Sequence, residues 1–128
     1  MRLPHLLAGI ALAGAAVPAG AATVIVDAHD NSVVGGVGKA TGITLTTGQT
    51  LTVVSALTDL WSAGPLPRWS NANGLTGDLF ATGSDESSEA SGTLIGQNAG
   101  STTQDGFTAP FGALVGKIGS TYQLLGAN

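Results

Sequence analysis

A predominantly apolar run has the sequence Phe111-Gly112-Ala113-Leu114-Val115-Gly116-Lys117-Ile118-Gly119, with Pro110 directly before it. Its apolar residues occupy both odd and even positions, so the run has no helical stripe. A short apolar run between proline and glycine signals is typical of a β-strand that is buried on both faces. We therefore predict a core strand over residues 113–118, a turn at Gly119-Ser120, and a second strand over residues 121–125 that pairs with the first.

Residues 43–57 carry the clearest local hairpin signal. Ile43-Thr44-Leu45-Thr46 and Thr50-Leu51-Thr52-Val53-Val54 alternate apolar and hydroxyl residues on either side of Thr47-Gly48-Gln49. This alternation predicts two antiparallel strands, with Ile43, Leu45, Leu51 and Val53 turned inward. The β-branched run at residues 23–26 is predicted to be the first strand of the chain.

Residues 70–106 consist mostly of Ser, Thr, Gly, Asn and Asp. We predict a long, mobile loop here, because few large apolar groups are available to offset the entropy of ordering it. A short strand is predicted within it at residues 93–95. About five or six short strands in total predict an all-β chain, organised as an incomplete antiparallel β-sandwich.

Composition limits the classes of function. The chain has 128 residues, enough for one domain, and only 9% of them are charged, whereas roughly a quarter is usual. The formal net charge of −4 provides no basic surface, so no nucleic-acid partner is expected. The absence of cysteine excludes a disulfide scaffold, a thiolate zinc site and a cysteine nucleophile.

The first 22 residues have the pattern of a signal peptide. Arg2 and His5 form a short polar region, residues 6–17 form an apolar run, and Ala19-Gly20-Ala21 offers a cleavage site. The run is too short to span a membrane; the alternative is a buried N-terminal helix. We predict a signal peptide over 1–22 and a secreted mature domain over 23–128, with no membrane span. Three cationic side chains against eight acidic ones then give the mature chain a net charge of −5.

Sequence motifs for catalysis are absent, and we do not expect an enzyme. The mature chain keeps one histidine, His29, and contains neither a G-x-S-x-G elbow nor an H-E-x-x-H pair. His29 with Asp27 and Asp30 forms either a ligand cluster or a surface turn, and Asp30-Asn31 favours the turn. Residues 85–89 concentrate three acidic side chains, but they lack the D-x-[DN]-x-[DN]-G calcium pattern, so a solvated acidic loop is predicted.

Two tryptophans are the candidate ligand-binding residues. Trp61 and Trp69 are separated by a segment rich in glycine and proline. Exposed aromatic rings in such a segment can provide apolar platforms for a sugar or a peptide, with the indole N–H as a polar handle. The alternative is that one or both rings cap the open end of the sandwich.

Further motifs follow one another in a recognisable order. These are Gly48-Gln49-Thr50-Leu51-Thr52-Val53-Val54-Ser55-Ala56, then Gly64-Pro65, then Arg68-Trp69, and finally residues 112–119. They resemble the G-D-x-I-T strand, the Tyr-Gly-Pro loop, the following Lys-Trp and the G-A-L-V-x-K-I-G strand of LecA-like galactophilic lectins. The resemblance covers residues 40–69 and 110–120, and the last motif is the most specific.

The resemblance implies a jelly-roll β-sandwich that binds a galactose-like carbohydrate through one calcium ion. One metal ligand of that family, a backbone carbonyl, falls on Ala63, and the family's sugar-contacting glutamine falls loosely on Gln104, followed by Asp105. The other metal ligands belong to a later loop, which this sequence does not reach. We therefore expect a domain truncated at its C-terminus: calcium would belong to a longer form of the protein, and this chain would bind it poorly.

Two functions follow from these expectations. The first is an exported carbohydrate-binding protein of the cell surface or extracellular matrix. The alternative is a structural surface protein that keeps the scaffold without a sugar site. An unpaired strand edge carrying Ile118, Tyr122 and Leu124 would also favour self-association.

Overall fold

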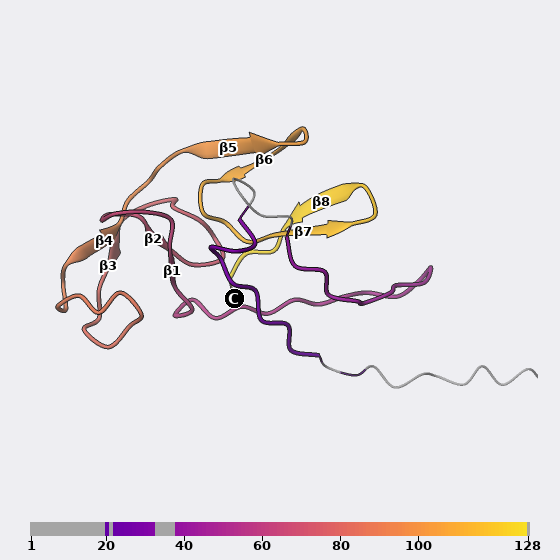
Figure 1. Cartoon of the computed structure of the whole chain (residues 1–128), viewed down its shortest axis with the longest axis horizontal. Coiled ribbons are helices and arrows are strands. Elements are labelled where there is room, and N and C mark those ends of the chain that lie inside the picture. Colours follow the sequence, from indigo (N-terminus) through magenta and orange to yellow (C-terminus); the bar gives the residue numbers. More distant parts are fainter. Residues whose placement is uncertain (1–19, 21, 33–37, 128) are drawn as a thin grey trace, which may run out of the picture.

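The chain folds from short antiparallel strand pairs. The computed structural model describes residue 20, residues 22–32 and residues 38–127, so the predicted signal peptide lies almost entirely outside the described residues. Within that part the structure is all-β: it contains strands and turns and no helix (Figure 1). Consequently, none of the described segments is a helix long and apolar enough to cross a membrane.

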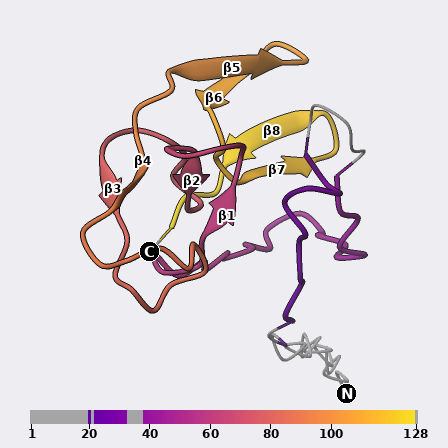
Figure 2. The ribbon, with the colours of Figure 1, turned by 60° about the vertical axis from the view of Figure 1, so that its left-hand side comes forward.

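The strands are β1 Trp61–Ser62, β2 Trp69–Ser70, β3 Leu79–Phe80, β4 Leu94–Gly96, β5 Ser101–Gln104, β6 Phe107–Pro110, β7 Val115–Ile118 and β8 Thr121–Leu124. Each pairs with its neighbour in sequence to form four two-stranded antiparallel sheets. A single bridge between Arg68 and Gly96 joins β2 to β4. The first four strands therefore follow the order β1-β2-β4-β3, with β1 and β3 at the two edges. Figures 1 and 2 show the β5–β6 and β7–β8 hairpins beside this group.

Most of the core lies in the segment that was predicted to be a loop. Leu75 and Ile95 are fully buried, and the other buried apolar residues are small: Ala72, Ala81 and Ala109. The Leu75 backbone N–H donates to the Phe111 carbonyl at 2.8 Å, and the Leu75 carbonyl accepts from the Ala99 N–H at 3.1 Å. The prediction of one long loop over 70–106 is therefore wrong. A few small apolar residues and backbone hydrogen bonds organise it, and β4 confirms the strand predicted near residue 95.

Gly74 allows the core segment to approach the β6–β7 connection closely. Its φ of +86° lies in the left-handed region, and a Cβ built on it would lie 2.7 Å from the Pro110 Cβ and 3.0 Å from the Ala113 Cβ. Both the backbone conformation and the space therefore require glycine. The nearby Leu114 N–H donates to the Ala72 carbonyl at 3.0 Å, which holds the two segments together.

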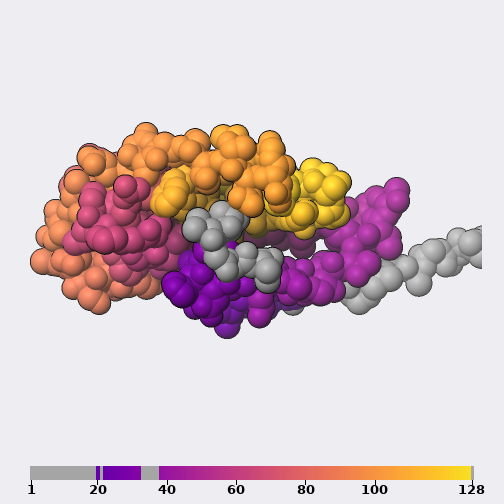
Figure 3. Space-filling view, turned by 45° about the horizontal axis from the view of Figure 1, so that its top comes forward, coloured from indigo at the N-terminus to yellow at the C-terminus, as the bar shows by residue number. Residues whose placement is uncertain are grey.

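The predicted hairpin over residues 43–57 is only half correct. Its turn is confirmed, because the Gln49 N–H donates to the Thr46 carbonyl at 3.0 Å. The flanking segments form no strands, and Ile43 and Leu51, predicted to face inward, are each 40% exposed. Residues 23–26 likewise form no strand. An isolated two-stranded hairpin is marginal in water, and part of this N-terminal region projects from the body (Figure 3).

The pairing predicted for the C-terminal strands is confirmed. Strand β7 pairs with β8 in the register Val115–Leu124 and Lys117–Tyr122. The prediction that this strand is buried on both faces is only partly correct: Val115 and Gly116 are half-buried, but Ile118 is 58% exposed. The β7–β8 pair is a two-stranded sheet, so among the described residues neither strand has a second strand beside it.

Candidate functional site

The two tryptophans lie on opposite faces of one strand pair. In the β1–β2 ladder Trp61 is opposite Ser70, and Ser62 is opposite Trp69. Directly opposed residues share a face, and successive residues alternate. Trp61 and Trp69 therefore do not form a joint aromatic platform, and each belongs to a different surface.

Trp61 anchors the β1–β2 pair to the turn before β7. Its indole Nε1–H donates to the Gly112 carbonyl at 3.0 Å. A Cβ built on Gly112 would lie 4.0 Å from the Ala63 Cβ, so Ala63 is next to the same turn. The Arg68 guanidinium lies 5.8 Å from the centre of the Phe111 ring. We call the group Trp61, Ala63, Arg68, Phe111 and Gly112 the Trp61 surface.

The Trp61 surface offers aromatic rings beside a strong hydrogen-bond donor. Trp61 and Phe111 are half-buried, and Arg68 is exposed. The guanidinium carries five N–H donors in a fixed planar arrangement. Among the described residues, the ion pair found joins His29 and Asp30. No described carboxylate therefore forms an ion pair with Arg68. A ligand with an apolar face and several hydroxyl or acidic oxygens suits this combination.

The described residues of the Trp61 surface do not form a calcium site. Calcium takes about six to eight oxygen ligands, and the surface offers the Ala63 carbonyl without a carboxylate. In the described part of the chain, the acidic and histidine side chains close enough to share a metal are Asp27, His29 and Asp30, in a different turn. No step of ligand binding is therefore assigned to calcium.

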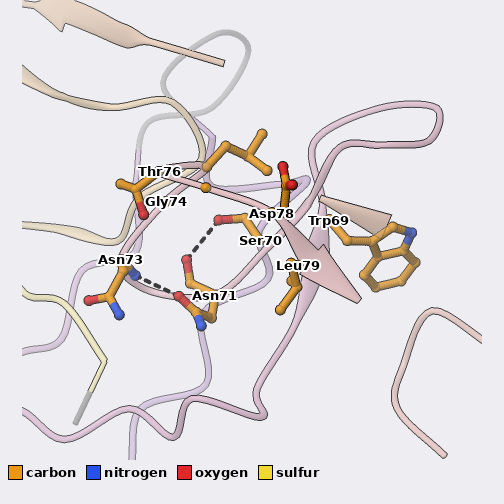
Figure 4. Close-up of a pocket in the computed structure, with 10 residues that line it drawn as sticks. Trp69, Ser70, Asn71, Asn73, Gly74, Thr76, Asp78 and Leu79 are labelled. Atoms are coloured by element: carbon orange, nitrogen blue, oxygen red, sulfur yellow. Dashed lines mark hydrogen bonds between the residues drawn. The ribbon is translucent and has the colours of Figure 1, made fainter. Parts of the chain in front are cut away.

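Trp69 borders a small hollow of about 160 Å³. Its lining residues come from one continuous stretch: Trp69, Ser70, Asn71, Asn73, Gly74, Leu75, Thr76, Gly77, Asp78 and Leu79. Figure 4 shows the Trp69 indole pointing away from the two asparagines. The volume is below the roughly 300–1,000 Å³ of ordinary ligand pockets.

The asparagines of this hollow are used to hold the chain together. Asn71 Oδ1 accepts from the Asn73 backbone N–H at 3.0 Å (Figure 4), and Asn71 Nδ2 donates to the Leu57 carbonyl at 3.2 Å. Asn73 Oδ1 accepts from the Ala127 N–H at 2.9 Å. These contacts give the hollow a structural role.

Gln104 and Asp105 lie at the tip of the β5–β6 hairpin, away from β1–β2 (Figure 1). Asp105 Oδ2 accepts from the Tyr122 hydroxyl at 2.5 Å. The Lys117 Nζ lies 4.6 Å from the centre of the Tyr122 ring. The Tyr122 side chain, and to a smaller extent the Asp105 charge, raise the pKa of Lys117. Of the predicted site residues, the structure therefore brings together only Trp61 and Ala63.

A larger hollow of about 420 Å³ lies between the turn at residues 57–58 and strand β3. Its lining combines apolar and polar side chains: Leu57, Thr58, Leu60, Leu79, Phe80, Thr82, Ser84, Asp85 and Glu86. We call it the Phe80 hollow. Sequence reasoning missed it, because two separate segments, residues 57–60 and 79–86, contribute to it and neither carries a binding motif.

Asp85 organises the acidic segment at one end of the Phe80 hollow. Oδ2 accepts from the Thr82 backbone N–H at 2.5 Å and from the Thr82 hydroxyl at 2.9 Å. Oδ1 accepts from the Ser87 N–H at 3.1 Å and from the Ser87 hydroxyl. The Ser87 hydroxyl, followed by the Thr82 N–H, lowers the pKa of Asp85 to about 2. The predicted solvated loop is therefore a hydrogen-bonded turn.

The turn predicted at residues 27–31 is confirmed. The backbone N–H groups of His29 and Asp30 both donate to Asp27 Oδ1 at 2.9 Å, and the Asn31 N–H donates to the Asp27 carbonyl at 3.0 Å. His29 Nδ1 lies 3.0 Å from Asp30 Oδ1. This hydrogen bond, and the charge of Asp30, raise the pKa of His29. The side chains of Asp27, His29 and Asp30 are all exposed, as expected for a surface turn.

Comparison with protein-family models, curated proteins and solved structures finds no match to this chain.

Proposed function

We propose that this chain is an exported carbohydrate-binding protein with a LecA-like β-sandwich scaffold, and that it binds sugar at the Trp61 surface. The observation that carries the proposal is the 3.0 Å hydrogen bond from the Trp61 indole to the Gly112 carbonyl. It joins residues 61–69 to residues 110–120, which are two segments that resemble the lectin motifs. The expected ligand class, a galactose-like sugar, comes from that resemblance.

The side chains of this surface suit the two sides of a sugar ring. The Phe111 and Trp61 rings can pack against the apolar C–H face of a hexose. Arg68 can donate to its hydroxyl oxygens, and the Ala63 carbonyl can accept from a hydroxyl. Because the guanidinium lies over the Phe111 ring, the arginine is positioned before the ligand arrives. The role is binding, with no catalytic step.

Retention of the full chain on immobilised galactose tests this proposal. We expect retention that free galactose competes away and that falls at least about fivefold in Arg68→Ala, because a hydrogen-bonding charged group is lost. Lys39→Ala is the matched control, since it removes an exposed positive charge from another segment. Absence of retention across a panel of neutral and acidic sugars, or equal retention of Arg68→Ala, would overturn the proposal.

A structural surface protein is the second candidate function. The observation in its favour is that Asn71 and Asn73, the asparagines of the hollow beside Trp69, are engaged by the chain itself. Ile118 and Leu124 on the β7–β8 hairpin are also 58% and 40% exposed, which favours self-association. Concentration-dependent assembly in sedimentation experiments, unchanged by sugar, would support this function over the first.

A further inference from the structure

The Phe80 hollow combines an apolar wall with an acidic end. Leu79 and Phe80 of β3 form one part of the wall, and the segment containing Leu57 and Leu60 forms the other. Asp85 and Glu86 lie at the polar end. Its volume of about 420 Å³ falls within the roughly 300–1,000 Å³ that is usual for ligand pockets.

The polar end is arranged so that its two carboxylates have different roles. Both oxygens of Asp85 already accept two hydrogen bonds each, so Asp85 contributes a fixed negative charge without a free acceptor position. Glu86 is exposed, and no ion pair with it occurs among the described residues. Glu86 is therefore the group that a ligand cation would contact.

The charge of the whole protein favours the same kind of ligand. The chain carries four Lys and Arg against eight Asp and Glu, a formal net charge of −4. The cationic side chains in the described segments are Lys39, Arg68 and Lys117, and none of them lines this hollow. A basic partner is therefore attracted to the molecule and meets no opposing positive charge in the lining of the hollow.

We propose that the Phe80 hollow binds a basic peptide segment in which a bulky apolar side chain lies next to lysine or arginine. The apolar side chain packs on Phe80 and Leu57, and the cation pairs with Glu86. A peptide fits better than an enclosed small molecule because Phe80 and Leu57 remain 53% and 57% exposed. The hollow also lies along β3, an edge strand of its group, so an extended segment has access to it.

Calorimetric titration of the full chain with acetyl-Leu-Lys-Leu-Lys-amide at low salt tests the proposal. We expect a dissociation constant of about 1 mM or tighter, and weaker binding when about 0.5 M salt screens the charges. Acetyl-Leu-Glu-Leu-Glu-amide lacks the cations, acetyl-Gly-Lys-Gly-Lys-amide lacks the apolar side chains, and both should bind at least about fivefold more weakly.

Three variants locate the binding. Glu86→Gln should weaken it about two- to fivefold, the range of an exposed ion pair, whereas Glu89→Gln removes the same charge outside the hollow and should change it less. Phe80→Ser should weaken it about tenfold, because the apolar contact is lost; an unchanged thermal transition shows that this variant folds.

Several results would overturn this proposal. They are equal binding of the acidic and basic peptides, affinities that do not respond to Glu86→Gln or Phe80→Ser, and binding of a small amine such as phenethylamine as tightly as the peptide. The last result would assign the hollow to small cationic ligands. None of these results bears on galactose binding at the Trp61 surface, because the two lining sets share no residue.

Discussion

The Tyr122 hydroxyl donates to Asp105 Oδ2 at 2.5 Å and thereby ties the β7–β8 hairpin to the tip of the β5–β6 hairpin. The Phe107 and Tyr122 rings stack beside this bond, with centroids 5.9 Å apart. Asp105 holds a φ of +48° in the turn, a conformation that aspartate tolerates better than most residues. Tyr122 therefore links the two hairpins, each of which would be marginal alone.

Replacing Tyr122 with phenylalanine should weaken this link without removing the ring stacking. We expect Tyr122→Phe to lower the free energy of unfolding by about 0.5–1.5 kcal/mol, the usual net value of one hydrogen bond. Urea denaturation of Tyr122→Phe, Asp105→Gly and the double variant measures the coupling. Strictly additive effects would show that the bond contributes nothing to stability.

Gly74 should be among the positions least tolerant of substitution. Gly74→Ala combines a left-handed backbone with overlap against Pro110 and Ala113, so we expect a loss of about 2–4 kcal/mol in unfolding free energy. Gly77→Ala is the matched control, since a Cβ there meets nothing within 4 Å. Equal stability of the two variants, measured by thermal denaturation, would show that the core is not packed as described.

Acid should destabilise the protein partly through Asp85. Its pKa is lowered from 3.8 to about 2, so the ionised carboxylate favours the folded chain above pH 3.8. This contribution is lost as the pH falls from 3.8 through 2, because the unfolded state then binds more protons. Asp85→Asn should be less stable at neutral pH and should lose less stability between pH 4 and pH 2. Melting temperatures of wild type, Asp85→Asn and the control Glu86→Gln measure this, and parallel curves for all three would contradict it.

The N-terminal signal peptide remains a prediction from sequence. We expect the exported protein to begin at Ala22 or Thr23, because the apolar run and the A-x-A site have the dimensions of a cleaved signal. N-terminal sequencing of secreted material is the direct test. An intact Met1 in that material would contradict the prediction.

The turns and the last hairpin could be predicted because their signals are local. Gly48, Gly119 and Asp27 mark turns that the structure contains, and the apolar spacing around Val115 predicts the β7–β8 pairing. The core could not be predicted in this way. Leu75 stands alone among polar residues, and backbone hydrogen bonds to the distant Phe111 and Ala99 hold it in the core. Ile95 lies in the strand predicted at residues 93–95, but a local pattern does not show that this strand is part of the core.

The candidate sites show the same division between local and distant information. The aromatic character of Trp61 and Trp69 is visible in the sequence. Their placement on opposite faces depends on the register of a two-residue ladder, which the glycine- and proline-rich connection between them does not reveal. The Phe80 hollow, likewise, exists only once Leu57 and β3 are brought together.

The most direct test of sugar binding at the Trp61 surface is a titration of the isotope-labelled full chain with methyl β-galactoside, followed by amide and indole NMR shifts. We predict saturable shifts at the Trp61 indole N–H and at the backbone amides of Ala63 and Gly112, with a millimolar dissociation constant typical of a single small contact surface. The amide of Thr103, in the β5–β6 hairpin, should not move. Absence of saturable shifts, or shifts confined to residues outside the Trp61 surface, would contradict the proposed function.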